Sequence, residues 1–334
     1  MMDITLVWFA IIGLGVLLYV VLDGFDLGIG ILFPFIRAKA ERDTMMNTVA
    51  PVWDGNETWM VLGGAGLFAA FPLAYATILS ALYMPITLMA LALIFRGVSF
   101  EFRFKMSRLQ KCWDYAFMWG SILSAFFQGV VLGAVIQGIK TTEGIFSGET
   151  FDWLTPFTVL TGIGVVVMYA TLGCAWLIYK TTDHLQQKMY RAMPKILMML
   201  LGIFALVLIA SVWVQPSIVE RWFVASHRIY FGLLVIITLF MFGLIFRAVQ
   251  QQKERQPFIY TILLLLVAFI SLLLSIFPYI IPPSIDIWQA AAPRSSQVFT
   301  LIGALIFIPM IIAYSLFSYW VFRGKVRVGD SGYH

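Results

Sequence analysis

The chain has 334 residues, of which 61% are hydrophobic and only 12% are charged, and its formal net charge is +5. Soluble domains are typically about 25% charged, so this composition excludes an ordinary soluble protein and indicates a polytopic membrane protein. The basic residues form no continuous tract, which argues against nucleic acid as a partner. The two cysteines, Cys112 and Cys174, are 62 residues apart, a spacing that indicates neither a disulfide framework nor a zinc site.

The N-terminal segment carries Asp3 and no basic region, so we expect no cleaved signal peptide and expect the first apolar stretch to stay as a span. Stretches long enough to cross a bilayer recur nine times along the chain. We predict an all-α membrane protein with a single membrane domain over residues 1–334 and nine transmembrane helices near 6–36, 49–71, 76–95, 113–139, 154–179, 196–215, 228–246, 258–281 and 298–322.

The distribution of basic residues predicts the orientation of these spans. The loops after the odd-numbered spans, together with the C-terminal tail, contain 18 of the 22 Lys and Arg residues. The loops on the opposite side contain only four, Lys140, Arg221, Arg228 and Arg294. Because cytoplasmic loops are enriched in Lys and Arg, we expect the N-terminus outside and the C-terminus in the cytoplasm.

Acidic residues interrupt the first two spans, where charge is costly by roughly 2.5–3.5 kcal/mol for each central residue. Asp23 and Asp26 lie in the first span, and Asp54 and Glu57 lie near the start of the second. Each pair is spaced i, i+3, so its members share a helix face. The predicted topology puts both pairs in the cytoplasmic half of the membrane on adjacent antiparallel helices. Four such acids require a functional or structural explanation.

Other polar residues in the spans have simpler interpretations. Arg96, at the end of the third predicted span, lies at the level of the acids and is either their partner or a snorkelling arginine. Gln128 and Gln137 in the fourth span either cross-link helices, which is the more common role, or line a wet path. Glycines accompany the acids, with Gly24 and Gly28 in a small-xxx-small spacing that favours close helix packing.

The three histidines, His184, His227 and His334, all lie outside or at the edge of the predicted spans. A haem site within the membrane normally requires such a ligand. We therefore expect that this chain ligates no haem or metal.

Three roles for the acids stay open from the residues alone. Buried carboxylates exchange protons near neutral pH and couple their titrations when they face each other, which suits proton conduction from the cytoplasm. Alternatively, Arg96 and Asn56 pair with the acids and only hold the helices together. The third interpretation is ion or substrate coupling in a secondary transporter. Two observations argue against it: no internal repeat is visible, and the acids are confined to the first third of the chain.

Three motifs in this part of the chain resemble subunit II of the cytochrome bd-type quinol oxidases. They are Asp23-Gly24-Phe25-Asp26-Leu27-Gly28, Trp53-Asp54-Gly55-Asn56-Glu57-Thr58-Trp59, and Phe95-Arg96-Gly97 followed by Glu101-Phe102-Arg103. The motifs cover about the first third, and the remainder agrees in hydropathy and number of spans. The short loops are most similar to the shorter, cyanide-insensitive branch.

The resemblance implies two four-helix bundles with one peripheral helix, in a complex of the bacterial inner membrane. It implies a partner, subunit I, that carries two b-type haems, one d-type haem and the quinol-oxidising loop. Such a complex oxidises quinol and reduces dioxygen to water with protons taken from the cytoplasm. A small single-span accessory subunit often accompanies the pair. A structural quinone or lipid in this chain stays open, although no motif indicates one.

The resemblance assigns a proton path to the acid of the Trp-Asp-Gly-Asn motif, which is Asp54 here. We expect Glu57, Asp23 and Asp26 to be its coupled neighbours. The supporting residues are expected to be Arg96, Trp53, Asn56, Trp59, Glu101 and Arg103. Two alternatives stay open for the whole chain, a proton-coupled secondary transporter and a purely structural subunit that stabilises the haem-bearing partner.

Overall fold

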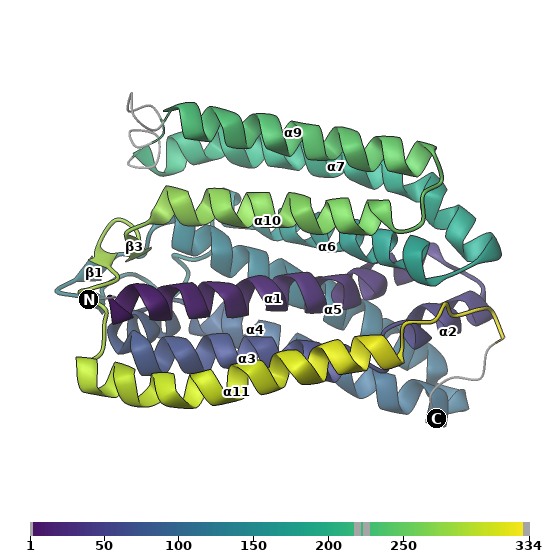
Figure 1. Ribbon diagram of the computed structural model, residues 1–334, viewed down its shortest axis with the longest axis horizontal. Helices are drawn as coiled ribbons and strands as arrows, with labels where there is room; N and C mark the ends of the chain where they lie inside the picture. Colours follow the sequence, from purple (N-terminus) through teal and green to yellow (C-terminus); the bar gives the residue numbers. More distant parts are fainter. Residues whose placement is uncertain (1–2, 217–221, 223–227, 330–334) are drawn as a thin grey trace.

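Long helices lying side by side make up most of the protein (Figure 1). The fold is that of a computed structural model and covers residues 3–216, 222 and 228–329; Arg221, His227 and His334 lie outside these residues. The elements are α1 Ile4–Leu32, η1 Phe33–Phe35, α2 Lys39–Asn47, α3 Trp53–Ala70, α4 Pro72–Lys105, η2 Ser107–Leu109, α5 Gln110–Gln137, β1 Thr141–Thr142, β2 Ile145–Phe146, α6 Pro156–Lys180, α7 Asp183–Val214, α9 Arg228–Gln250, α10 Gln256–Ile276, β3 Tyr279–Ile281, β4 Ile285–Asp286 and α11 Arg294–Val321.

Eight helices in the described part of the chain are long and apolar enough to cross a membrane, namely α1, α4, α5, α6, α7, α9, α10 and α11. They correspond to eight of the nine predicted spans. The ninth, 49–71, contains α3, which has 18 residues and packs along α1 and α4. Its first turns hold Asp54, Asn56 and Glu57, and these polar residues lower the mean hydropathy of the helix. The count of nine spans therefore stays a prediction.

Two helices extend well beyond their predicted spans. Helix α4 continues to Lys105, ten residues past the predicted end at 95, so Arg96 lies inside the helix rather than at its end. Helix α7 begins at Asp183 instead of 196. In both cases the added turns are polar, so a hydropathy criterion places the boundary of the span inside the helix. Both extensions stay helical although that of α4 contains Gly97 and that of α7 contains Pro194.

Local sequence explains several helix ends. At α6, Thr155 and Thr158 form a capping box, with Pro156 at the first helical position. A single residue, Phe71, separates α3 from α4, which then starts at Pro72. Helix α5 ends at Gly138, whose φ of +94° is a conformation that favours glycine.

Glycines allow α1 to pack closely on α5 and α6, as their spacing predicts. A Cβ atom on Gly28 would collide with the carbonyl oxygen of Tyr169, and one on Gly173 would lie 2.5 Å from the Gly28 carbonyl carbon. A Cβ atom on Gly30 would collide with Ser121 of α5. Helix α6 is correspondingly central, with 67% of its most apolar window buried. This close packing positions the acidic part of α1 in the protein interior.

The helices form two groups of neighbours. Helices α1, α3, α4 and α5 contact one another in sequence, as do α6, α7, α9 and α10, and α11 lies against α3 and α1. Helix α1 begins at the end that carries the strand pairs β1–β2 and β3–β4, whereas α11 ends at the opposite end, near α2 (Figure 1). These contacts are compatible with two four-helix bundles and one peripheral helix. That arrangement and the assignment of one end to the cytoplasm stay predictions.

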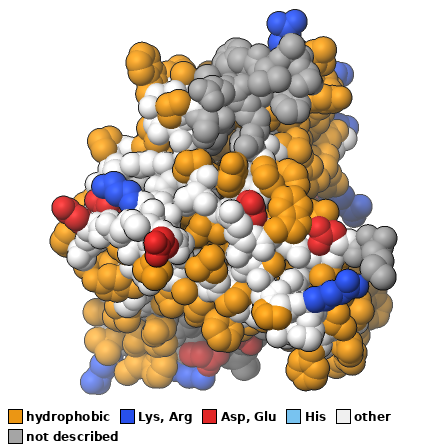
Figure 2. Space-filling view, turned by 90° about the vertical axis from the view of Figure 1, so that its left-hand side faces the viewer, with side chains coloured by type: hydrophobic (Ala, Val, Ile, Leu, Met, Phe, Trp, Pro, Cys, Tyr) orange, Lys and Arg blue, Asp and Glu red, His pale blue; other side chains and the backbone are white. Residues whose placement is uncertain are grey.

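Apolar side chains cover much of the outer surface of the helices. Viewed from the end that carries the strand pairs, they surround a more polar centre (Figure 2). Helix α11 is the most exposed of the candidate spans, with only 6% of its apolar window buried. Such a surface is expected for a protein that contacts lipid and a partner subunit.

Candidate functional site

A buried arginine forms the centre of the acidic region. Arg96 of α4 is fully buried, and its guanidinium nitrogens lie 2.5 Å from an oxygen of Asp23 and 2.6 Å from an oxygen of Glu57. A third carboxylate oxygen, on Asp26, is 3.6 Å away. Arg96 therefore joins α1, α3 and α4. We call Arg96, Asp23, Asp26 and Glu57 the ion cluster.

The helix geometry explains why these residues meet. Asp23 and Asp26 are almost one turn apart on α1, so both face α3 and α4. Both side chains are buried there, with 1% exposure or less. Glu57 reaches the same point from the second turn of α3 and keeps 23% of its side chain exposed. Burial of several charges without partners would cost several kcal/mol for each ion. The guanidinium of Arg96 offsets part of this cost.

Two aromatic rings cover the guanidinium. The centroids of Trp53 and Phe100 lie 5.5 and 5.4 Å from the central carbon of the Arg96 guanidinium, and the two rings stack with their centroids 5.0 Å apart. Trp53 fits here because residue 97 is glycine, where a Cβ atom would lie 3.2 Å from the indole. Trp53 thus shapes the site through cation–π contact and exclusion of water.

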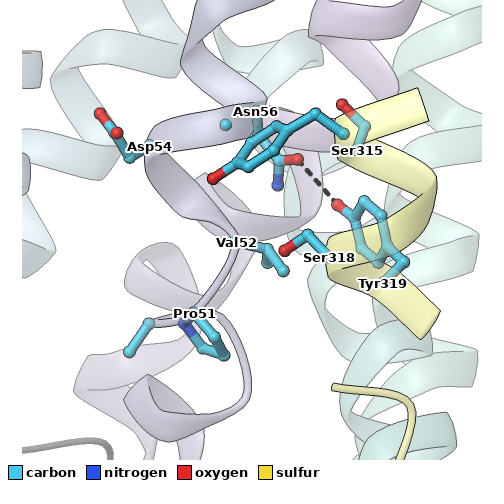
Figure 3. Close-up of a pocket in the computed structure, with 10 residues that line it drawn as sticks. Pro51, Val52, Asp54, Asn56, Ser315, Ser318 and Tyr319 are labelled. Atoms are coloured by element: carbon cyan, nitrogen blue, oxygen red, sulfur yellow. Dashed lines mark hydrogen bonds between the residues drawn. The ribbon is translucent and has the colours of Figure 1, made fainter. Parts of the chain in front are cut away.

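Asn56 connects the ion cluster to helix α11. Its side-chain nitrogen donates to Asp26 over 2.8 Å, and its side-chain oxygen accepts a hydrogen bond of 2.8 Å from the Tyr319 hydroxyl. Figure 3 shows this second bond between α3 and α11. Tyr319 was not among the residues selected from the sequence. It lies in an apolar span 263 positions from Asn56, and no local pattern distinguishes it from the other interfacial aromatics.

Asp54 lies apart from the ion cluster. Its side chain is exposed and points away from the Asn56–Tyr319 hydrogen bond (Figure 3). The residue lines a cavity of about 40 Å³ between α3 and α11, together with Asn56, Ser315, Ser318 and Tyr319. Asp54, which the sequence resemblance assigns to the proton path, therefore borders a small polar cavity, whereas Glu57, one turn later, belongs to the ion cluster.

The remaining predicted residues have separate surroundings. Trp59 is buried on α3, and its indole nitrogen has no hydrogen-bond partner in the structure. Glu101 is exposed and forms an i, i+4 ion pair with Lys105. Arg103 is buried but pairs with Asp43 and Asp114 at 2.6 and 2.5 Å. Glu101 and Arg103 thus lie outside the ion cluster, and Arg103 ties α2 and α5 to the end of α4.

A second polar group lies next to the cluster. Gln128 of α5 donates to the Tyr19 hydroxyl over 2.8 Å and accepts from the Tyr169 hydroxyl over 2.7 Å. Gln137 accepts a hydrogen bond of 2.8 Å from Thr155. Both glutamines therefore cross-link helices, as the sequence indicates. Tyr19 lies one turn before Asp23 on α1, so this group borders the ion cluster.

Fold and site together define a helical membrane protein with an arginine–carboxylate cluster buried between three helices. Comparison with known proteins gives its family. Residues 4–322 match the family described as cytochrome bd terminal oxidase subunit II. The chain therefore belongs to this family, and the complex of which it is a subunit is a respiratory terminal oxidase.

Individual relatives support the assignment over nearly the full length. The chain is 27% identical to cytochrome bd-I ubiquinol oxidase subunit 2 of Escherichia coli K12, in an alignment that covers 97% of this chain and 95% of the relative. It is 29% identical to cytochrome bd ubiquinol oxidase subunit 2 of Bacillus subtilis 168, with 96% of each chain covered. A chain in the solved structure of bd oxidase from Geobacillus thermodenitrificans has the same fold, with a TM-score of 0.80, 14% identity, and coverage of 96% of this chain and 99% of that one.

Proposed function

We propose that this chain is the non-haem subunit of a quinol:dioxygen oxidoreductase of the bacterial inner membrane and that it contributes a proton path to the partner subunit. Membership in the subunit II family supports the oxidase part of this proposal. The ion cluster supports the proton part. In this proposal the haem-bearing subunit I oxidises quinol and reduces dioxygen, while protons come from the cytoplasm.

The charge balance of the ion cluster is the observation that carries the proton path. Three carboxyl groups surround one guanidinium, and no other Lys or Arg in the described residues forms an ion pair with Asp23, Asp26 or Glu57. One oxygen of Asp23 and one of Asp26 are buried without a hydrogen-bond partner among the residues that the structure describes. Full ionisation would leave two uncompensated negative charges in the interior, which is costly. A shared proton removes part of this imbalance, and such a group can pass a proton on.

Asp54 is the proposed entry of the proton path, and it marks the surface that we expect the partner subunit to cover. An exposed carboxylate at this depth in a bilayer would face hydrocarbon unless another chain covers it. We infer that subunit I covers the face of α3 that carries Asp54 and that the carboxyl group contacts water or polar groups there. The proposed route runs from Asp54, past the cavity at Asn56, to the ion cluster.

A structural role is the second candidate, favoured by the number of helices that Arg96 joins. An arginine that binds acids on two neighbouring helices stabilises the bundle whether or not protons move. The two roles differ in what an isosteric, uncharged substitution does. A small accessory subunit, a bound lipid or quinone, and a place in the cyanide-insensitive branch stay predictions.

Copurification tests the oxidase assignment. A tagged chain isolated from its native membrane should bring a haem protein, visible in a reduced-minus-oxidised spectrum. Isolation of an intact complex without haem would contradict the assignment.

The Asp26→Asn variant tests the choice between a proton path and a structural role. We expect the complex to assemble with a normal haem spectrum and to lose most of its turnover. Asp152→Asn removes a surface ion pair with Lys140 at 3.0 Å and keeps an oxygen that can accept from the Glu149 amide, so it should turn over normally. Normal turnover of an assembled Asp26→Asn complex would favour the structural role.

A further inference from the structure

We propose that Tyr319 is a positioning residue for the proton path and that it fixes the Asn56 amide with its NH₂ group towards Asp26. The inference rests on the proposed function, since it assigns a role within that path. It adds α11, a helix with no acidic residue, to the site.

The Asn56 amide has one acceptor and one donor group, and both are used. The Tyr319 hydroxyl donates to the oxygen, while the nitrogen donates to Asp26 and, over 3.4 Å, to the carbonyl oxygen of Leu22. Rotation of the amide by 180° would place its oxygen against these two acceptors. A hydroxyl that donates to the amide oxygen therefore selects the orientation in which Asn56 donates to Asp26.

The Tyr319 ring is held by aromatic side chains from two other helices. Phe25 of α1 and Trp176 of α6 contact it with centroid distances of 6.5 and 6.4 Å in edge-to-face geometry. The chain just after α11 is also fixed, because Lys180 donates to the carbonyl oxygens of Phe322 and Gly324 at 2.5 and 3.0 Å. The hydroxyl is thus presented to Asn56 from a rigid position.

The cavity between α3 and α11 gives this hydrogen bond a functional setting. Its volume of about 40 Å³ is enough for about three or four water molecules, each of which needs roughly 10–15 Å³ on this measure. The wall includes the Ser315 hydroxyl, which is buried and has no hydrogen-bond partner in the described part of the chain. Tyr319 and Asn56 both line this cavity (Figure 3), and Asn56 also donates to Asp26. Protons that reach the cavity meet the cluster at the Asn56–Asp26 hydrogen bond.

A double-mutant cycle in the assembled oxidase tests the inference. Tyr319→Phe removes only the hydroxyl, and Asn56→Ala removes the group on which it acts. Tyr179→Phe is the matched control, since Tyr179 belongs to the same aromatic cluster, with its centroid 5.8 Å from that of Trp176. The measurements are haem content, quinol KM and turnover number across a pH series.

We expect Tyr319→Phe to lower turnover by about fivefold, the effect of one lost hydrogen bond, with unchanged quinol KM and a shifted pH profile. Tyr179→Phe should behave as wild type. The double variant should lose no more than Asn56→Ala alone, because both changes act on the same contact.

The outcomes separate the inference from the proposed function. Wild-type turnover of Asn56→Ala and Asp26→Asn would contradict the proton path itself. Loss of turnover in those two variants with a wild-type pH profile in Tyr319→Phe would overturn the role of Tyr319 alone. Additive losses in the double variant, or failure of only the Tyr319→Phe complex to assemble, would also overturn it, since either shows a role that does not act through Asn56.

Discussion

Arg96 and Asp23 lie 2.5 Å apart, and neither side chain has more than 1% exposure. They belong to different helices, α4 and α1, and are 73 positions apart in the chain. A buried ion pair of this kind contributes little net stability compared with a packed apolar pair, but loss of one partner leaves an uncompensated charge. The pair therefore makes the fold sensitive to substitution at either residue.

Replacement of Arg96 should be more harmful than replacement of an exposed arginine. Arg96→Leu leaves three acids without their cation, so we expect a loss of about 3–5 kcal/mol in stability and poor assembly. Arg96→Lys keeps the charge without the forked geometry and should be intermediate. Thermal unfolding of the purified complex measures both. Equal melting temperatures for wild type and Arg96→Leu would show that the ion cluster does not hold the helices.

Gly28→Ala should prevent the close contact of α1 with α6. The new Cβ atom would collide with the backbone of Tyr169, which cannot move like a flexible side chain. Overpacking typically costs about 1–3 kcal/mol. Gly202→Ala is the control, because no atom lies within 4 Å of its added Cβ, and it should be neutral or stabilising. Similar melting temperatures for the two variants would contradict the packing account.

The contact between α2 and α7 should make stability depend on pH. Burial disfavours ionisation of Glu41, but hydrogen bonds from Lys188 and His184 outweigh it and hold the Glu41 pKa below its ordinary value of 4.5. The contribution is therefore present above the unfolded-state pKa and is lost as pH falls through the lower folded-state value. The stability difference between wild type and Glu41→Gln should shrink between about pH 6 and pH 3. A difference that is constant over this range would contradict the prediction.

Lys180 should control the accessibility of the C-terminal segment. Its ammonium group binds two carbonyl oxygens of that segment, and the amide of Val326 donates to the Lys180 carbonyl over 2.8 Å. Lys180→Met removes the first two contacts while keeping most of the unbranched side chain. We expect faster trypsin cleavage after Arg323 and Lys325 in this variant. Unchanged cleavage rates would show that the segment is held by other contacts.

The sequence predicts the helical class and the membrane-length helices because apolar runs are a local property. The sequence also predicts that the first-span acids, Glu57 and Arg96 lie at a similar depth in the membrane, because motif spacing and span orientation both follow from local sequence. The structure separates Asp54 from Glu57, although the i, i+3 spacing places them on one face. Asp54 lies in the first turn of α3, where it borders the cavity between α3 and α11 and is exposed.

Other parts of the site depend on tertiary packing and could not be predicted. Tyr319 meets Asn56 only because α11 lies beside α3, and nothing in the sequence near residue 319 indicates that contact. Arg103 is seven residues after Arg96 and hence on a similar face of α4, but it is about 10 Å further along the axis. At that distance it meets Asp43 and Asp114 in place of the ion cluster.

Proton uptake by the complex with Asp54→Asn shows whether protons enter the oxidase through this chain. The complex is reconstituted into vesicles and supplied with quinol and oxygen, and turnover and proton uptake are compared with wild type and Asp152→Asn. We expect an assembled, haem-containing Asp54→Asn complex with strongly reduced turnover and proton uptake, while Asp152→Asn matches wild type. Normal turnover and proton uptake in the assembled Asp54→Asn complex would contradict this expectation.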